Sequence, residues 1–204
     1  MRRLLTSAIV ALLLTLAAPS AHALPPWMQN GKAGRFMFNL KFGPSIGVDN
    51  VITQFAIVPE MGIAVDRDFN AYIILPLPAF QVAFDQSIIQ VPIGFQYDIA
   101  IKAVPGLYIS PAITTGFAAI IYDYNNNTCP NCQTGTIPAG FFQPEVSGKL
   151  IFNRRFNVGF VPFSLPIYFG STQHGIVTPN GTLVNGGSFA FVSYRILVYG
   201  GINF

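Results

Sequence analysis

The two cysteines of the chain, Cys129 and Cys132, are the first residues whose types and spacing could do chemistry. A C-x-x-C pair can act as a redox centre or supply half of a zinc site. A redox pair needs a helix N-terminus that favours the thiolate, and the asparagine-rich sequence around this pair indicates no helix. No second cysteine pair or histidine pair completes a zinc site, and Gln133 stands where covalent haem attachment requires histidine. We therefore expect a local disulfide between Cys129 and Cys132, with no metal ion and no cofactor.

His174 is the second candidate, because it is the only histidine after residue 23. A nucleophilic enzyme would need this imidazole beside a hydroxyl and a carboxylate, and only Ser171 and Thr172 supply nearby hydroxyls. We expect an ordinary histidine in a polar loop. A lipid-modifying enzyme that uses His174 is the minor alternative.

The elements that must position these residues are β-strands, because apolar residues recur at every second position. In residues 89–101 the odd positions are isoleucine, valine, phenylalanine or tyrosine, and the even positions are small or polar. Such a period places the two sets on opposite faces of a strand. The pattern predicts eight strands, at 36–48, 52–65, 71–83, 89–101, 107–121, 141–152, 156–169 and 189–204. The strands at 71–83 and 156–169 alternate poorly and are placed mainly by their flanking turns.

The connections between these strands are of two kinds. Tight turns follow the second, fourth and sixth strands, and short links follow the first and third. Long polar stretches at 122–140 and 170–187 follow the fifth and seventh strands, so both lie at the same end. Short periplasmic turns and long extracellular loops are typical of outer-membrane barrels. The sequence therefore predicts an all-β fold, a transmembrane antiparallel up-and-down β-barrel of eight strands.

Charged residues on the second face of these strands would point into the barrel interior. They are Lys41, Glu60, Asp98, Lys102, Glu145, Lys149 and Arg195. Four are positive and three are negative, so we expect them to form a charge network across a narrow interior. A soluble β-sandwich or lipocalin-like barrel is the alternative fold, but its second face would be rich in lysine and glutamate.

Aromatic residues near the strand ends are expected to form girdles at the two membrane interfaces. They include Phe36, Tyr97 and Phe204 at one end and Phe80, Phe142 and Tyr168 at the other. Nine prolines inside the predicted strands do not fit a closed barrel, since each removes a ladder hydrogen bond. They are Pro44, Pro59, Pro76, Pro78, Pro92, Pro111, Pro144, Pro162 and Pro166.

The composition agrees with a membrane barrel. Only 9% of the 204 residues are charged and 51% are hydrophobic, whereas soluble domains average roughly 25% charged residues. The first 23 residues, with Arg2 and Arg3, an apolar core and a small-x-small site at Ala21–Ala23, predict a cleaved signal peptide. Residues 24–204 then carry nine basic and eight acidic residues, which excludes an electrostatic footprint for nucleic acid.

The C-terminus carries a motif. Alternating residues end in a terminal phenylalanine, in the series Tyr194, Ile196, Val198, Ile202 and Phe204. Together with the alternation over residues 24–204, this pattern resembles the small OmpA/OmpW-type outer-membrane β-barrels of Gram-negative bacteria. The resemblance implies a location in the outer membrane, among its lipids and lipopolysaccharide. It also implies that the barrel assembly machinery reads the C-terminal series during insertion.

Three functions remain open at this point, and no extracellular partner is named by the sequence. A closed structural or surface-interaction barrel is the physical default, because eight strands enclose a space that side chains can fill. A narrow OmpW-like channel for small or hydrophobic solutes is the alternative, since small interior candidates could leave space. They are Gly43, Gly47, Gly62, Gly94, Gly116 and Ala118. The lipid-modifying enzyme is the third.

Overall fold

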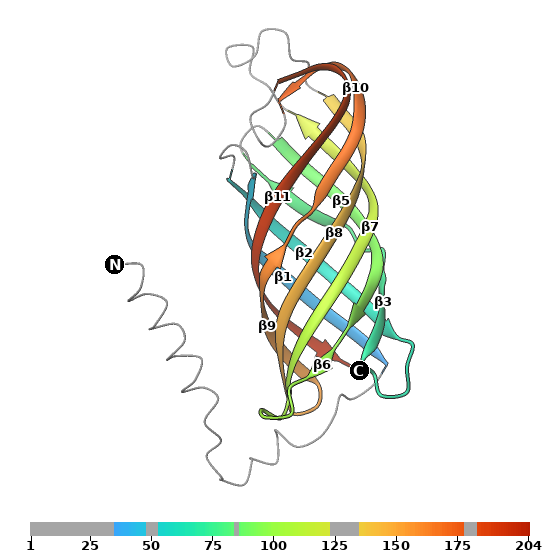
Figure 1. The fold of residues 1–204 in the computed structure, drawn as a ribbon, viewed down its shortest axis with the longest axis vertical. Helices are drawn as coiled ribbons and strands as arrows, with labels where there is room; N and C mark the ends of the chain where they lie inside the picture. The colour runs from blue at the N-terminus through green and yellow to red at the C-terminus, as the bar shows by residue number, and fades with distance from the viewer. Residues whose placement is uncertain (1–34, 48–52, 84–85, 123–134, 178–182) are drawn as a thin grey trace, which may run out of the picture.

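The computed structural model describes residues 35–47, 53–83, 86–122, 135–177 and 183–204. The predicted signal peptide and both cysteines lie outside these residues. The strands are β1 (Phe36–Gly47), β2 (Thr53–Ala64), β3 (Ala71–Leu75), β4 (Ala79–Val82), β5 (Gln86–Tyr97), β6 (Ile99–Ala100), β7 (Leu107–Tyr122), β8 (Gly135–Phe152), β9 (Phe156–Ser164), β10 (Ile167–Val177) and β11 (Leu183–Asn203). Figure 1 shows them tilted around a common axis.

These segments form a closed ring of eight antiparallel strands, which confirms the predicted fold. Three of the eight are interrupted, so β3 continues as β4, β5 as β6, and β9 as β10. The ring closes because β1 pairs with β2 on one side and with β11 on the other. In the described residues no helix is long and apolar enough to cross a bilayer.

Side chains alternate between a buried interior and an apolar outward face, as the sequence period requires. Along β1, Met37, Asn39 and Lys41 are buried, while Phe38 and Leu40 between them are exposed on the outside. The interior face is the small and polar one. The exposed face carries phenylalanine, isoleucine and valine, and would be unstable in water.

Residues 156–169, which alternate poorly in the sequence, form the wall strand made of β9 and the start of β10, and its inward face changes along its length. Val161 and Ser164 are both buried, whereas Pro162 and Phe163 between them are both exposed. The registers of β9 with β8 and with β11 both shift at this point. Such a bulge inserts one residue and moves the following side chains to the opposite face. Tyr168 is therefore fully buried in the interior, and its predicted place in an outer girdle is wrong.

Several of the prolines lie where the hydrogen-bond ladder between neighbouring strands is interrupted. Pro76 and Pro78 separate β3 from β4, Pro166 separates β9 from β10, and Pro162 occupies the bulge. Pro44 is paired with Phe55 of β2. On the other side of β1, the pairing with β11 omits Gly43 and Pro44. Outside the bulge, the Tyr194 hydroxyl donates a hydrogen bond to the Pro162 carbonyl, which satisfies an acceptor that the bulge leaves on the apolar face.

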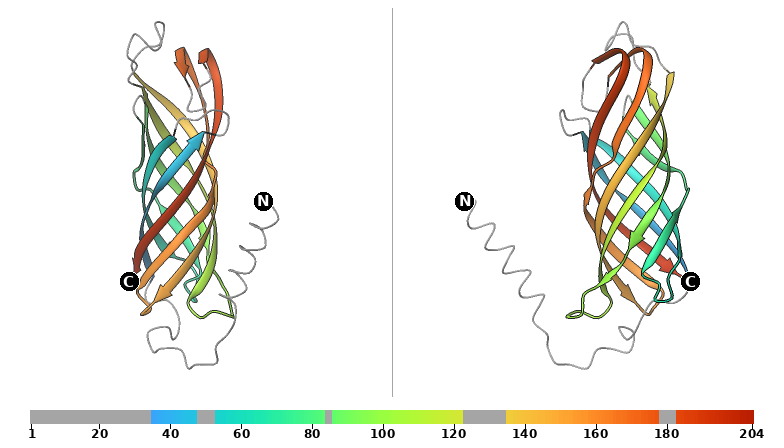
Figure 2. Two further views of the ribbon diagram at one scale, coloured as in Figure 1. Left: turned by 90° about the vertical axis from the view of Figure 1, so that its left-hand side faces the viewer. Right: turned by 45° about the vertical axis from the view of Figure 1, so that its right-hand side comes forward.

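The two ends of the barrel differ. Turns at 66–70, 101–106 and 153–155 lie at the end that carries the C-terminus, as the views in Figure 2 show. At the opposite end β8 and β11, with 18 and 21 residues, extend beyond the 12-residue strands β1 and β2.

The predicted loops at 122–140 and 170–187 are shorter than expected, because these long strands extend into them. Pairing of β7 with β8 continues to Tyr122 and Gly135, and pairing of β10 with β11 continues to Val177 and Leu183. Backbone hydrogen bonds need no apolar side chains, so polar sequence can extend a hairpin. His174 consequently lies in strand β10 and not in a loop.

Candidate functional site in the barrel interior

The interior contains the candidate site, because six of the seven predicted charged residues are buried there. They are Lys41, Glu60, Asp98, Glu145, Lys149 and Arg195. Three are positive and three negative, so the buried charge is balanced. Lys102 does not belong to this group, since it is exposed in the turn before β7. The strand ends at Ala100, two residues before the alternation would have carried Lys102 inside.

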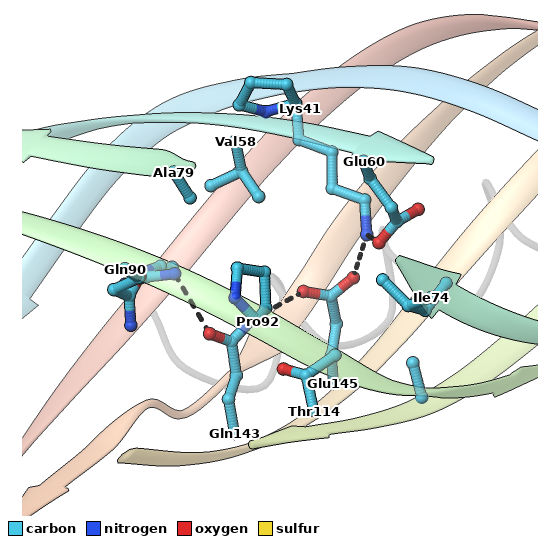
Figure 3. Close-up of a pocket in the computed structure, with 13 residues that line it drawn as sticks. Lys41, Val58, Glu60, Ile74, Ala79, Gln90, Pro92, Thr114, Gln143 and Glu145 are labelled. Carbon is cyan, nitrogen blue, oxygen red and sulfur yellow. Dashed lines mark hydrogen bonds and ion pairs between the residues drawn. The ribbon is translucent and has the colours of Figure 1, made fainter. Parts of the chain in front are cut away.

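Lys41 occupies the centre of the first charge cluster. Its ammonium lies 2.6 Å from a carboxylate oxygen of Glu60 and 2.6 Å from one of Glu145 (Figure 3). β1, β2 and β8 supply these residues, so the cluster joins opposite parts of the wall. Asn39 donates a further hydrogen bond of 2.9 Å to Glu60. Removing one member of such a buried group typically costs about 3–5 kcal/mol, because the remaining charge is left unpaired.

A continuous chain of hydrogen bonds connects this cluster to Arg195. Gln143 donates to Glu145 over 3.2 Å and accepts from the Arg195 guanidinium over 3.1 Å. The same guanidinium donates to Gln90 at 2.6 Å and to the Tyr168 hydroxyl at 2.7 Å. Arg195 is thus held by neutral groups, while its charge offsets the second carboxylate of the Lys41 cluster.

The chain of hydrogen bonds continues toward the end of the barrel that carries the long hairpins. Gln81 donates to the Tyr168 hydroxyl, and Ser45 donates to Gln81 over 2.8 Å. A separate ion pair joins Lys149 to Asp98 nearer the turn end, where Gln96 donates to Asp98 over 2.8 Å. The Lys149 ammonium also lies 5.5 Å from the centre of the Tyr72 ring.

An apolar cluster fills the interior at the hairpin end, and the sequence interpretation did not identify it. Its members are Ile88, Ala118, Ile120, Ala139, Phe141, Tyr168, Phe189 and Phe191. The rings of Tyr168 and Phe191 are stacked with centroids 4.7 Å apart. The sequence did contain a signal for this cluster. Phe189 and Phe191 stand at odd positions, whereas the outward series from Tyr194 to Phe204 stands at even positions.

Neighbouring side chains cover several interior glycines. A Cβ placed on Gly159 would lie 2.2 Å from the Tyr199 ring, and one on Gly62 would lie 3.4 Å from Tyr72. Gly62 is one of the small residues that the channel hypothesis named, and the side chains of Met37 and Tyr72 occupy the space beside it. A cavity of about 20 Å³ lies between the Lys41 cluster and Arg195. This volume suffices for about one water molecule.

The other sequence candidates lie elsewhere. Tyr194, Ile196, Val198, Ile202 and Phe204 all follow the outward face of β11 up to the C-terminus. Gly47, Gly94 and Gly116 lie in β1, β5 and β7, and the predicted disulfide falls outside the described residues. The part of the chain that the structure describes contains no group of three or more histidine, cysteine, aspartate or glutamate residues that could hold a metal ion.

Comparison with solved structures supports this architecture. The crystal structure of Neisserial surface protein A superposes with a TM-score of 0.54 over 83% of this chain and 96% of that chain, at 7% identity. The chain has the fold of the small eight-stranded outer-membrane barrels. The N-terminal β-barrel domain of Pseudomonas aeruginosa OprF is also similar, with a TM-score of 0.45, 11% identity and coverage of 84% and 98%. No protein-family model and no curated protein matches the chain.

Proposed function

We propose that this protein is an integral outer-membrane β-barrel whose interior is closed, and that it acts as a structural or surface-interaction protein. The fold and the apolar outward face support the membrane location, and the signal-peptide pattern supports export. The tight turns would then face the periplasm, and the long hairpins of β7–β8 and β10–β11 would project outside the cell.

The observation that carries the closed interior is the hydrogen-bonded chain that runs from Asn39 through Lys41 and Arg195 to Ser45. Every charge in it is balanced within the interior, and the cavity beside it admits about one water molecule. A conducting pore needs a continuous aqueous path, which these side chains occupy.

The proposed partners follow from location. Outer-membrane lipids and lipopolysaccharide would surround the apolar face, and the barrel assembly machinery would read the outward series that ends at Phe204. An extracellular partner would meet the long hairpins.

Planar-bilayer conductance of refolded residues 24–204 tests the closed interior, after a gel-mobility shift on boiling has established that the barrel is folded. We expect no steady conductance. A Phe38→Ala variant, altered only on the outward face, should be equally silent. Reproducible steps that change when Glu60 or Arg195 is neutralised would overturn the proposal and identify a narrow channel.

A further inference from the structure

The charges outside the barrel interior are distributed unequally between its two ends. At the turn end, the exposed basic residues are Arg35, Arg67, Lys102, Arg154 and Arg155. The segments that join strands at the opposite end, 48–52, 83–85, 123–134 and 178–182, contain Asp49, Asp85 and Asp123 but no lysine or arginine. We call the five exposed basic residues the basic rim.

The acidic residues near the basic rim do not neutralise it. Asp68 is exposed, but Asp66 is only partly so, and its carboxylate accepts hydrogen bonds from the backbone of Asn70 and Ala71 at 2.8 and 2.9 Å. Asp66 therefore shapes the turn between β2 and β3. The rim keeps an excess of positive charge in total, because its five basic residues, from four successive points of the ring, outnumber these two acidic residues, which flank Arg67.

The rim also lies at a defined height, directly beyond a belt of aromatic side chains. Arg35 precedes Phe36, whose ring stacks on that of Phe204 with centroids 5.8 Å apart. Arg155 precedes Phe156, which is 46% exposed and stacks on Phe152 with centroids 6.0 Å apart. Outer-membrane barrels carry girdles of aromatic residues at both membrane interfaces, so the rim is placed where lipid phosphates lie.

We propose that the basic rim binds the phosphate headgroups of anionic phospholipids in the periplasmic leaflet. Arginine donates paired hydrogen bonds to phosphate, and a basic residue at an anionic membrane surface contributes about 1 kcal/mol. A phospholipid fits better than a soluble polyanion, because the same chain segments offer apolar rings to the acyl chains. The sequence of the segments that join strands at the opposite end offers no lysine or arginine for binding lipopolysaccharide phosphates in this way. The inference rests on the proposed membrane location but not on a closed interior.

Native mass spectrometry of the folded barrel in detergent tests this inference. Phosphatidylglycerol and phosphatidylcholine with identical acyl chains are supplied in equal amounts, and the lipids retained are counted. We expect the wild-type protein to retain phosphatidylglycerol preferentially. The double variant Lys102→Gln/Arg155→Gln should lose this preference by about fivefold per residue, and Asp68→Asn should increase it.

A matched control separates the rim from overall charge. Thr136→Asp/Ser188→Asp changes the net charge by the same amount at the opposite end, where both positions are exposed. We expect this control to retain the wild-type preference. Undiminished phosphatidylglycerol retention by the Lys102/Arg155 variant would overturn the inference, and so would equal losses in both double variants. A barrel that conducts yet selects phosphatidylglycerol through the rim would refute only the closed interior.

Discussion

Around Lys41 the barrel interior is filled by charged and amide side chains, whereas around Phe191 it is filled by aromatic and aliphatic ones. Lys41, Glu60 and Glu145 meet across the barrel through hydrogen bonds of 2.6 Å. Phe191 instead stacks between Tyr168 and Phe189, with centroids 4.7 and 6.0 Å away. Both regions fill the interior with side chains, but they are stabilised by different physical means.

The difference matters because the two regions depend on different properties of their side chains. In the charged region, stability depends on charge balance, since an unpaired buried charge is strongly unfavourable. In the aromatic region it depends on volume, since an empty space forfeits packing. Tyr168 belongs to both, because its ring packs in the aromatic cluster while its hydroxyl accepts from Arg195.

The largest effect is expected at Lys41. In Lys41→Met the carboxylates of Glu60 and Glu145 face one another without a cation, so we expect a loss of about 4–5 kcal/mol in the free energy of unfolding. Urea titration in lipid vesicles, followed by gel mobility without boiling, measures it.

Two controls sharpen this test. Phe42→Met changes the next residue on the outward face and should shift the midpoint little. Lys41→Met/Glu60→Gln removes one charge of each sign, leaves Glu145 balanced by Arg195, and should recover most of the lost stability. If this double variant is no more stable than Lys41→Met, charge balance is not what stabilises this region.

A smaller loss is expected at Phe191. Phe191→Ala should cost about 3–4 kcal/mol, because it leaves a cavity beneath the stacked Tyr168 ring. Phe191→Leu retains most of the volume and should cost about 1.5 kcal/mol. The same urea titration measures both variants. Equal stability of the alanine and leucine variants would show that volume does not hold the aromatic region together.

Period-two alternation made the charged region predictable from the sequence. β1, β2 and β8 alternate without interruption, so the phase set by their apolar residues places Lys41, Glu60 and Glu145 inside. The mutual distances of these residues were not predictable. They depend on the tilt and register of strands that are distant in the sequence.

The place of Tyr168 in the aromatic region was not predictable in the same way, because its wall strand changes phase, as does the wall strand formed by β3 and β4. In the wall strand formed by β3 and β4, Tyr72 and Ile74 are buried on even positions, whereas Ala79 and Gln81 are buried on odd ones. The break at Pro76 and Pro78 produces this change, and the bulge at Pro162 does the same before Tyr168. The alternation of the sequence does not show how many residues an interruption contains, so the face of each side chain beyond it cannot be predicted.

The smallest effect is expected at the junction of the two regions. Tyr168→Phe keeps the stacked ring but removes the hydroxyl that accepts hydrogen bonds from Arg195 and Gln81. Two buried donors then lose a partner, so we expect a loss of about 1–3 kcal/mol.

Tyr194→Phe is the matched control for this change, because its hydroxyl bonds the Pro162 carbonyl on the outward face. The combination of Tyr168→Phe with Phe191→Leu shows which property Tyr168 contributes. If the hydroxyl serves only the charged region, the two losses add. If the hydroxyl also fixes the ring against Phe191, the double variant deviates from additivity by 0.5 kcal/mol or more, as contacting residues do. Additive losses would mean that the charged and aromatic regions stabilise the barrel independently of each other.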